Sequence, residues 1–416
     1  MALLLVQMTT VLLVALCCGW LARKLGQAGV IGEILGGILI GPSVFGRVAP
    51  QASAALFPPN SFGAFEVLST VGLILFLFLI GSELDLEHLR QQKRTAFLAS
   101  GMSIFLPFTM GAVAAQSLRL RFAPDSIGSA SFVLFLGISM SITAFPVLVR
   151  ILEDRRMIST PLGTTALMCA AVDDVCAWTL LAVALTLVPH SGQSMAISYR
   201  LVGLCVYLVV MLTVVRPLGK WVVKRRKTER FSYEFLGIVV AFVLASAAAT
   251  EALGVHPLFG AFMAGVCFPR LEPLQKFLRA RIYMIVSVLL LPLFFALTGM
   301  RTRLDMLNSA SIWLWTGVIL LIAITGKMGG SVLAARWTGQ SWRDSVALGA
   351  LLNTRGLVEL IVLNIAYNAQ VFSQTLFTML VVMALVTTMM TTPILNMLDV
   401  GSRVRDEKDL ALAEVT

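Results

Sequence analysis

The chain has 416 residues, of which 58% are hydrophobic and 13% are charged, and its mean hydropathy is +0.89. A soluble protein carries roughly 25% charged residues, so this composition indicates an integral membrane protein. The net charge of +10 does not indicate nucleic-acid binding, because the basic residues lie in short segments between apolar runs. The six cysteines fall in apolar segments without metal-ligand spacing and indicate no disulfide framework.

Apolar runs of about 20 residues, which is long enough to cross a bilayer, predict an all-α polytopic protein with about thirteen transmembrane helices. The predicted spans lie near 3–22, 28–46, 65–82, 95–117, 127–149, 160–188, 196–217, 233–251, 255–269, 282–300, 310–335, 344–367 and 374–397. The second and ninth are short and rich in glycine.

The distribution of Lys and Arg predicts the orientation in the membrane. Loops after odd-numbered spans, together with the C-terminal tail, hold 24 of the 32 basic residues, whereas loops after even-numbered spans hold 6. Positive charge collects on the cytoplasmic side, so we expect the N-terminus outside and the C-terminus in the cytoplasm. The largest basic cluster, Arg216–Arg230, is predicted to be a cytoplasmic linker. A bacterial inner membrane is the expected location, with a plant-like or organellar one left open.

The two halves of the chain are similar. GEILGGILIGPSVFG in span two parallels GVHPLFGAFMAGVCFP in span nine, and spans three and ten carry Gly81 and Gly299 before a charged Leu-Asp stretch. Seven spans separate matching elements, so the copies cross the membrane in opposite directions, as in many secondary transporters. Small-residue packing motifs can produce a similar pattern.

We therefore predict one membrane transporter domain over 1–400. It consists of a first repeat at about 3–188, a linker helix at about 196–217 and a second repeat at about 233–397. Residues 401–416 are expected to form a short cytoplasmic tail without a regulatory domain.

Two adjacent aspartates, Asp173 and Asp174, are the only charges in the apolar segment from Pro161 to Pro189. One carboxylate at the centre of a membrane helix costs about 2.5–3.5 kcal/mol on insertion scales. Two neighbouring anions there must face water, bind cations or hold protons, unless they only satisfy a neighbouring helix. The pair is therefore the candidate binding site.

Two spans in matching positions of the two halves are predicted to be interrupted. In span five, Pro146 removes a helical hydrogen bond, and the hydroxyls of Ser139, Ser141 and Thr143 can satisfy the freed carbonyls. Span twelve contains a polar tetrapeptide that ends in glycine: Asn353, Thr354, Arg355 and Gly356. Irregular backbone at membrane depth is tolerated where protein covers it or where it lines a wet cavity. An ordinary proline kink and a helix end are the alternative.

Further charges are predicted to be buried with these breaks. Lys327 lies too deep in span eleven to reach the interface and requires an anion, for which the aspartate pair is the candidate. Arg355 and Glu359 are four residues apart and can pair on one helix face, so their role is at least partly structural. Glu33 can equally be interfacial, and His256 is interpreted as a structural hydrogen-bonding group.

The motifs GEILGGILIGPS, SITAFPVLVRILED, AVDDVCAW, GVHPLFGAFMAG and NTRGLVELIVLN occur in this order. With them the chain resembles the monovalent cation:proton antiporters, in particular the branch of bacterial sodium/proton and potassium/proton exchangers and plant cation/proton exchangers. The resemblance covers about residues 5–397 and implies the Na+/H+ antiporter fold, with two inverted repeats and crossed discontinuous helices. It also implies a homodimer in the bilayer, in which a core domain moves like an elevator against a dimerisation domain.

The resemblance implies roles for individual residues. Asp174 matches the essential cation- and proton-binding carboxylate, and Asp173 matches its partner, which pairs with a lysine at Lys327 in electrogenic members. Thr143 and Arg355 match the first and second helix breaks. Potassium/proton members often carry Gln or Asn before the key aspartate, whereas this chain has Asp.

We expect a non-enzymatic secondary antiporter without a cofactor, in which a monovalent alkali cation and protons compete for Asp174 and Asp173. Na+ is favoured and K+ is possible, with oxygens near Ser141 and Thr143 completing the shell. A sodium-coupled symporter of a small organic anion is the alternative, although it requires a roomier polar cavity. An intramembrane aspartyl protease is disfavoured, because adjacent helical residues point about 100° apart. Single buried charges also fit alternating access better than the charged ring of a channel.

Overall fold

The computed structural model describes residues 2–58, 62–83, 93–124, 127–158, 160–186, 197–225, 232–253 and 257–399. Within these ranges the chain is helical and contains no strand, which confirms the all-α prediction. Ten of the described helices are long and apolar enough to cross a membrane, and three shorter apolar helices coincide with the remaining predicted spans. His256 and the predicted tail 401–416 lie outside the described residues.

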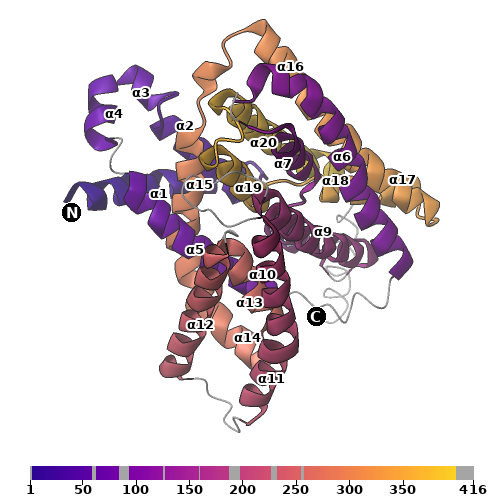
Figure 1. Cartoon of the computed structure of the whole chain (residues 1–416). Coiled ribbons are helices and arrows are strands. Elements are labelled where there is room, and N and C mark those ends of the chain that lie inside the picture. Colours follow the sequence, from indigo (N-terminus) through magenta and orange to yellow (C-terminus); the bar gives the residue numbers. More distant parts are fainter. Residues whose placement is uncertain are drawn as a thin grey trace, which may run out of the picture. The chain divides into compact units, whose positions relative to one another are not determined.

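The chain divides into two compact units. The first consists of Met1–Leu13, Pro50–Asp85 and Ala182–Leu297, and the second of Val14–Ala49, Leu86–Leu181 and Thr298–Thr416. Three helices contribute residues to both units (Figure 1): α1 (Ala2–Lys24), α9 (Pro161–Thr186) and α15 (Leu291–Arg301).

The first unit contains seven further described helices. They are α4 (Pro50–Leu56), α5 (Phe62–Glu83), α10 (Ile197–Val210), α11 (Arg216–Arg225), α12 (Tyr233–Ala252), α13 (Pro257–Cys267) and α14 (Glu272–Leu278). A π-helical turn, Met211–Val215, joins α10 to α11, and two more, Arg279–Tyr283 and Val286–Leu290, precede α15.

Two boundaries in the first unit differ from the predictions, because charged residues near a helix end were interpreted as loop. The basic cluster that starts at Arg216 is helical as far as Arg225, where the guanidinium stacks over the Trp221 ring at 4.1 Å. The predicted span at 282–300 belongs to a helical stretch that already begins at Glu272. An ion pair of 2.6 Å between Glu272 and Lys276, one turn apart, supports this first turn.

The second unit contains ten further described α-helices. They are α2 (Gly29–Ile40), α3 (Phe45–Val48), α6 (Lys93–Phe122), α7 (Ser129–Ser141), α8 (Phe145–Asp154), α16 (Ala310–Ile324), α17 (Gly330–Trp337), α18 (Trp342–Leu352), α19 (Leu357–Asn368) and α20 (Gln374–Met397). Serine side chains cap the N-termini of α16, α18 and α20 by accepting a backbone N–H from the first turn: Ser309, Ser341 and Ser373.

Both predicted helix breaks are present. The chain between α7 and α8 is non-helical at 142–144, and the chain between α18 and α19 is non-helical at 353–356. Pro146 lies in the first turn of α8, where a missing N–H costs no helical hydrogen bond. The interruption therefore precedes Pro146, and the proline starts the second half-helix.

Close glycine contacts repeat in the two halves. A Cβ atom on Gly265 of α13 would lie 2.9 Å from the Cα of Gly81 in α5. A Cβ atom on Gly299 of α15 would likewise lie 2.9 Å from the Cα of Gly37 in α2. Because α13 matches α2 and α15 matches α5 in the sequence repeat, the same kind of helix contact occurs twice, each time between one helix of the first copy and one helix of the second. Such backbone approach requires small residues in a membrane helix pair.

Replacing Gly265 with alanine is expected to destabilise the protein by about 1–3 kcal/mol, because overpacking forces the helices apart. The new methyl group would clash with the carbonyl oxygen of Phe78. Gly317→Ala is the matched control, since a Cβ atom there has no neighbour within 4 Å. Thermal unfolding of the purified variants in detergent measures the difference, and equal midpoints for the two variants would contradict the packing argument.

Candidate functional site

The site in the second unit is built around a π-helical turn, Thr325–Gly329, which carries Lys327. Helix α6 packs closely against this turn and the start of α17. A Cβ atom on Gly326 would lie 2.8 Å from the Cα of Pro107, and one on Gly330 would lie 2.6 Å from the carbonyl oxygen of Met102. The glycines beside Lys327 therefore let α6 approach its backbone, and π turns often occur at functional sites.

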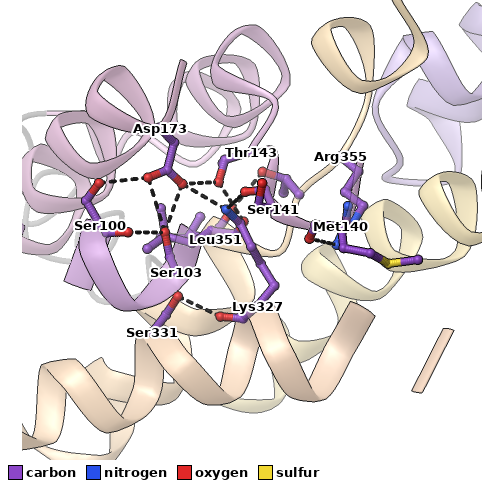
Figure 2. Close-up of polar contacts among 12 residues, drawn as sticks. Ser100, Ser103, Met140, Ser141, Thr143, Asp173, Lys327, Ser331, Leu351 and Arg355 are labelled. Atoms are coloured by element: carbon purple, nitrogen blue, oxygen red, sulfur yellow. Dashed lines mark hydrogen bonds and ion pairs between the residues drawn. The ribbon is translucent and has the colours of Figure 1, made fainter. Parts of the chain in front are cut away.

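Asp173 of α9 is surrounded by hydrogen-bond donors (Figure 2). Its carboxylate accepts hydrogen bonds from three hydroxyls, those of Ser100 at 2.8 Å, Ser103 at 2.9 Å and Thr143 at 2.6 Å. The Lys327 ammonium forms an ion pair with Asp173 Oδ2 at 2.8 Å, and both side chains are fully buried. The site therefore satisfies Asp173 as an anion.

Asp174 has the opposite environment. Its side chain is 0% exposed, and neither carboxylate oxygen has a hydrogen-bond partner among the described residues. An isolated buried carboxylate is strongly penalised unless a proton or a cation neutralises it. Two aspartates that are adjacent in sequence are thus chemically different: Asp173 has its donors from the protein, and Asp174 has none.

Two cationic side chains bind the carbonyl end of α7. Arg355 donates to the carbonyl of Ser139 at 2.6 Å and to that of Met140 at 2.7 Å, and Lys327 donates to the carbonyl of Ser141 (Figure 2). The last carbonyls of a helix lack intrahelical partners and carry partial negative charge. Lys327 and Arg355 satisfy these carbonyls at the first break.

Neutral hydroxyl groups satisfy the carbonyls at the second break. The carbonyls of Ala350, Leu351 and Leu352 at the end of α18 accept hydrogen bonds from hydroxyls of Thr391, Thr354 and Thr143, respectively. The two breaks also touch directly, since the Ala144 N–H donates to the Thr354 carbonyl at 2.9 Å. The hydroxyl of Thr143 therefore links both breaks to Asp173.

The buried charges nearly cancel. Lys327 pairs with Asp173, and Arg355 pairs with Glu359 at 3.1 Å; all four side chains are almost completely buried. With these four groups ionised their formal charges sum to zero. Asp174 is then the one buried carboxylate of this cluster without a compensating charge, and a single H+ or a single monovalent cation restores the balance.

The structure brings the predicted site residues together, with differences in detail. The hydroxyl of Ser141 donates to the carbonyl of Ile138 in its own helix, so its contribution to Lys327 comes from its backbone carbonyl. Asn353 is buried, and its side-chain oxygen has no partner among the described residues. A Cβ atom on Gly19 of α1 would lie 3.4 Å from the Cγ atom of Glu33 in α2, so Glu33 packs beside α1.

Sequence reasoning did not identify Ser100 and Ser103. Serines are common at helix contacts inside membranes, where they often bond to their own backbone. The available signal was their spacing, because residues three apart on α6 lie on one face of the helix.

Comparisons with known proteins identify the family of the chain and a solved structure with a similar fold. The chain matches the family of the sodium/hydrogen exchanger, transmembrane, over residues 12–397. The chain belongs to the sodium/hydrogen exchanger family. Its fold resembles that of the sodium proton antiporter MjNhaP1 from Methanocaldococcus jannaschii, with a TM-score of 0.70, 16% identity and coverage of 95% of this chain and 97% of the other. The fold prediction is thereby confirmed.

Several members of the sodium/hydrogen exchanger family are similar in sequence. The Na(+)/H(+) antiporter NhaS4 of Synechocystis is 39% identical over 90% of this chain and 92% of its own length. Cation/H(+) antiporter 15 of Arabidopsis thaliana is 37% identical over 94% of this chain, and K(+)/H(+) antiporter 1 of Saccharomyces cerevisiae is 32% identical over 88%. The match covers only 47% and 43% of those two longer proteins.

Replacing Arg355 with methionine is expected to destabilise the protein by about 3–5 kcal/mol, because the change leaves a buried carboxylate unpaired. It also removes both hydrogen bonds to the end of α7. Glu359→Gln is the matched variant: it removes the other charge of the pair and leaves the bonds of Arg355 to α7 in place. Thermal unfolding is expected to show the larger loss for Arg355→Met, and a larger loss for Glu359→Gln would contradict the capping role.

Proposed function

We propose that this protein exchanges a monovalent alkali cation for protons across a membrane, with Asp174 as the group for which they compete. One observation carries the proposal: Asp174 is fully buried without a hydrogen-bond partner among the described residues, in the same cluster as two ion pairs whose charges cancel. Because either ligand supplies the missing positive charge, the core is electrically balanced only when one of them is bound. An empty, charged core is costly to move across an apolar barrier.

The residues around the ion pair of Lys327 and Asp173, next to Asp174 in the sequence, suit a hard, monovalent cation. Asp173, Thr143 and the backbone carbonyl of Ser141 provide oxygen atoms close to Lys327. We propose Na+ as the favoured cation and K+ as a possible one. The name of the Synechocystis relative, which this chain matches over most of its length, supports Na+, and that of the yeast relative supports K+.

Lys327 makes the exchange electrogenic in this proposal. Its ammonium binds Asp173 when the site is loaded with protons and leaves Asp173 when a cation enters. The cycle carries more than one proton per cation because Asp174 releases one proton and Lys327 gives up another as it leaves Asp173 as a neutral amine, although coupled groups share these protons. Asp174 is closed to solvent, so exchange requires opening to each side in turn, which elevator-type movement of inverted repeats provides.

We also propose an orientation, a location and an oligomeric state for the protein in the membrane. The Lys and Arg distribution supports an N-terminus outside and a C-terminus in the cytoplasm, and we propose a bacterial inner membrane as the location. The family resemblance supports a homodimer. The alternative, a sodium-coupled symporter, requires a polar solute cavity. The small cavity next to Arg355 is instead lined mostly by apolar residues: Val30, Ile31, Ile34, Leu360, Ala384 and Leu385.

Asp174→Asn is expected to abolish exchange, because the amide keeps the shape of the side chain but cannot alternate between proton and cation. A pH-sensitive dye in everted vesicles measures proton movement after addition of Na+ or K+, and the variant should give the signal of empty vesicles. Asp305→Asn is the control, since Asp305 pairs with Arg303 at 2.7 Å outside the cluster. Full activity in Asp174→Asn would reject the assignment.

Lys327→Met is expected to reduce charge movement more than cation binding, because it removes the ammonium that alternates with the cation. Transient currents from proteoliposomes on a solid support measure the charge moved, and titration calorimetry measures binding. Lys276→Met, at a side chain that is 76% exposed, is the control. Currents equal to those of the wild type would count against the role of Lys327.

A further inference from the structure

Ser103 has more hydrogen-bond acceptors than it can use at one time. Its hydroxyl lies 2.9 Å and 3.2 Å from the two carboxylate oxygens of Asp173 and 3.0 Å from the carbonyl oxygen of Ser100. A hydroxyl has one hydrogen and two lone pairs. The side chain is 0% exposed, so water does not compete for this hydrogen. It can therefore donate either to Asp173 or to the helix backbone.

We propose that Ser103 is a ligand of the transported cation, and that its hydroxyl hydrogen turns from Asp173 to the Ser100 carbonyl when the cation replaces the Lys327 ammonium. This inference rests on the proposed exchange and adds a residue that determines cation specificity. It concerns a residue of α6, whereas the sequence predictions drew the site from α7, α9 and Lys327.

The argument follows from the difference between an ammonium and a bare ion. The ammonium of Lys327 donates hydrogens to Asp173 Oδ2 and to the Ser141 carbonyl. An alkali cation at the same carboxylate has no hydrogens and requires oxygen lone pairs from its surroundings. Ser103 already lies 2.9 Å from Asp173 Oδ2, the oxygen to which Lys327 binds. Turning its hydrogen to the backbone directs a lone pair toward the cation and leaves no polar atom unsatisfied.

Thr143 also has a hydroxyl with two possible acceptors, the Asp173 carboxylate and a backbone carbonyl. It donates to Asp173 Oδ2 at 2.6 Å and has an alternative acceptor in the Leu352 carbonyl at 3.1 Å. Ser100 differs from both within the part of the chain that the structure describes, because there its hydroxyl has Asp173 Oδ1 as its one acceptor, at 2.8 Å, without an alternative backbone carbonyl. Ser103 and Thr143 can therefore act as ligands, whereas Ser100 holds Asp173 in position.

Ser103→Cys tests the proposal with a change of ligand chemistry. A sulfur atom favours a soft cation such as Tl+ over hard Na+. In proteoliposomes, the ratio of apparent affinities for Tl+ and Na+ is expected to rise about tenfold relative to the wild type. Ser103→Ala is expected to raise the apparent KM for Na+ about tenfold with a nearly unchanged maximal rate.

Two matched variants separate a ligand from a structural serine. Ser100→Cys changes a neighbouring donor to the same carboxylate, and Ser82→Cys changes a buried serine that donates to the Leu79 carbonyl of its own helix at 2.7 Å. Neither is expected to change the Tl+/Na+ ratio. An unchanged ratio in Ser103→Cys, or the same rise in Ser100→Cys, would overturn the proposal.

Binding measurements distinguish this inference from the proposed function. Titration calorimetry of the purified proteins with Na+ and with Tl+ reports ligand chemistry without transport. If the wild type binds cations but exchanges none for protons, the exchange proposal fails, and the Ser103→Cys ratio still decides the ligand assignment. If Ser103→Cys does not fold, the KM and maximal rate of Ser103→Ala decide it, and a loss confined to the maximal rate contradicts a ligand role.

Discussion

The ammonium of Lys327 holds together two features on which the second unit depends. It binds Asp173, and it binds the carbonyl end of α7 at Ser141. If the ammonium leaves this position, a buried carboxylate and a helix end both lose their positive partner. In the proposed exchange a monovalent cation supplies the same single positive charge to Asp173, so this carboxylate keeps a positive partner when the ammonium leaves. The same positive charge therefore serves both the carboxylate of the site and the carbonyl end of the interrupted helix.

The two helix breaks are stabilised differently. Neutral hydroxyls bind the carbonyls at the end of α18, whereas cationic side chains bind those at the end of α7. The hydroxyls of Thr391 and Thr354 bind carbonyls at the end of α18, so these two hydrogen bonds do not involve the aspartate pair. The end of α7 depends on two cationic side chains, of which Arg355 is held by Glu359 and Lys327 by Asp173. In the proposed exchange Arg355 thus provides permanent support, whereas Lys327 connects the backbone of α7 to the occupancy of the site. Close glycine contacts at Gly326 and Gly330 keep α6 near enough to complete that connection.

Much of the fold could be predicted because the length of the apolar runs defines membrane spans. The pairing at the centre of the site could be predicted because buried Lys327 required an anion, for which the aspartate pair was the candidate. Other features depended on three-dimensional contacts. Adjacent residues point in different directions on a helix, but only the structure shows that Asp173 faces the hydroxyls of α6 while Asp174 faces none. Ser100 and Ser103 resemble ordinary packing serines in the sequence. The π turn at Lys327 and the helical start of the basic cluster at Arg216 have no distinct composition, so the first was missed and the second was interpreted as a linker.

The central claim is that a proton and an alkali cation exclude one another at the aspartate pair. Titration calorimetry of the purified protein with Na+, in buffers of different ionisation enthalpy, counts the protons released for each cation bound. The account predicts at least one proton released per cation at a pH where the site is loaded with protons. Cation binding whose heat does not depend on the buffer would mean that no proton leaves, and it would contradict the account.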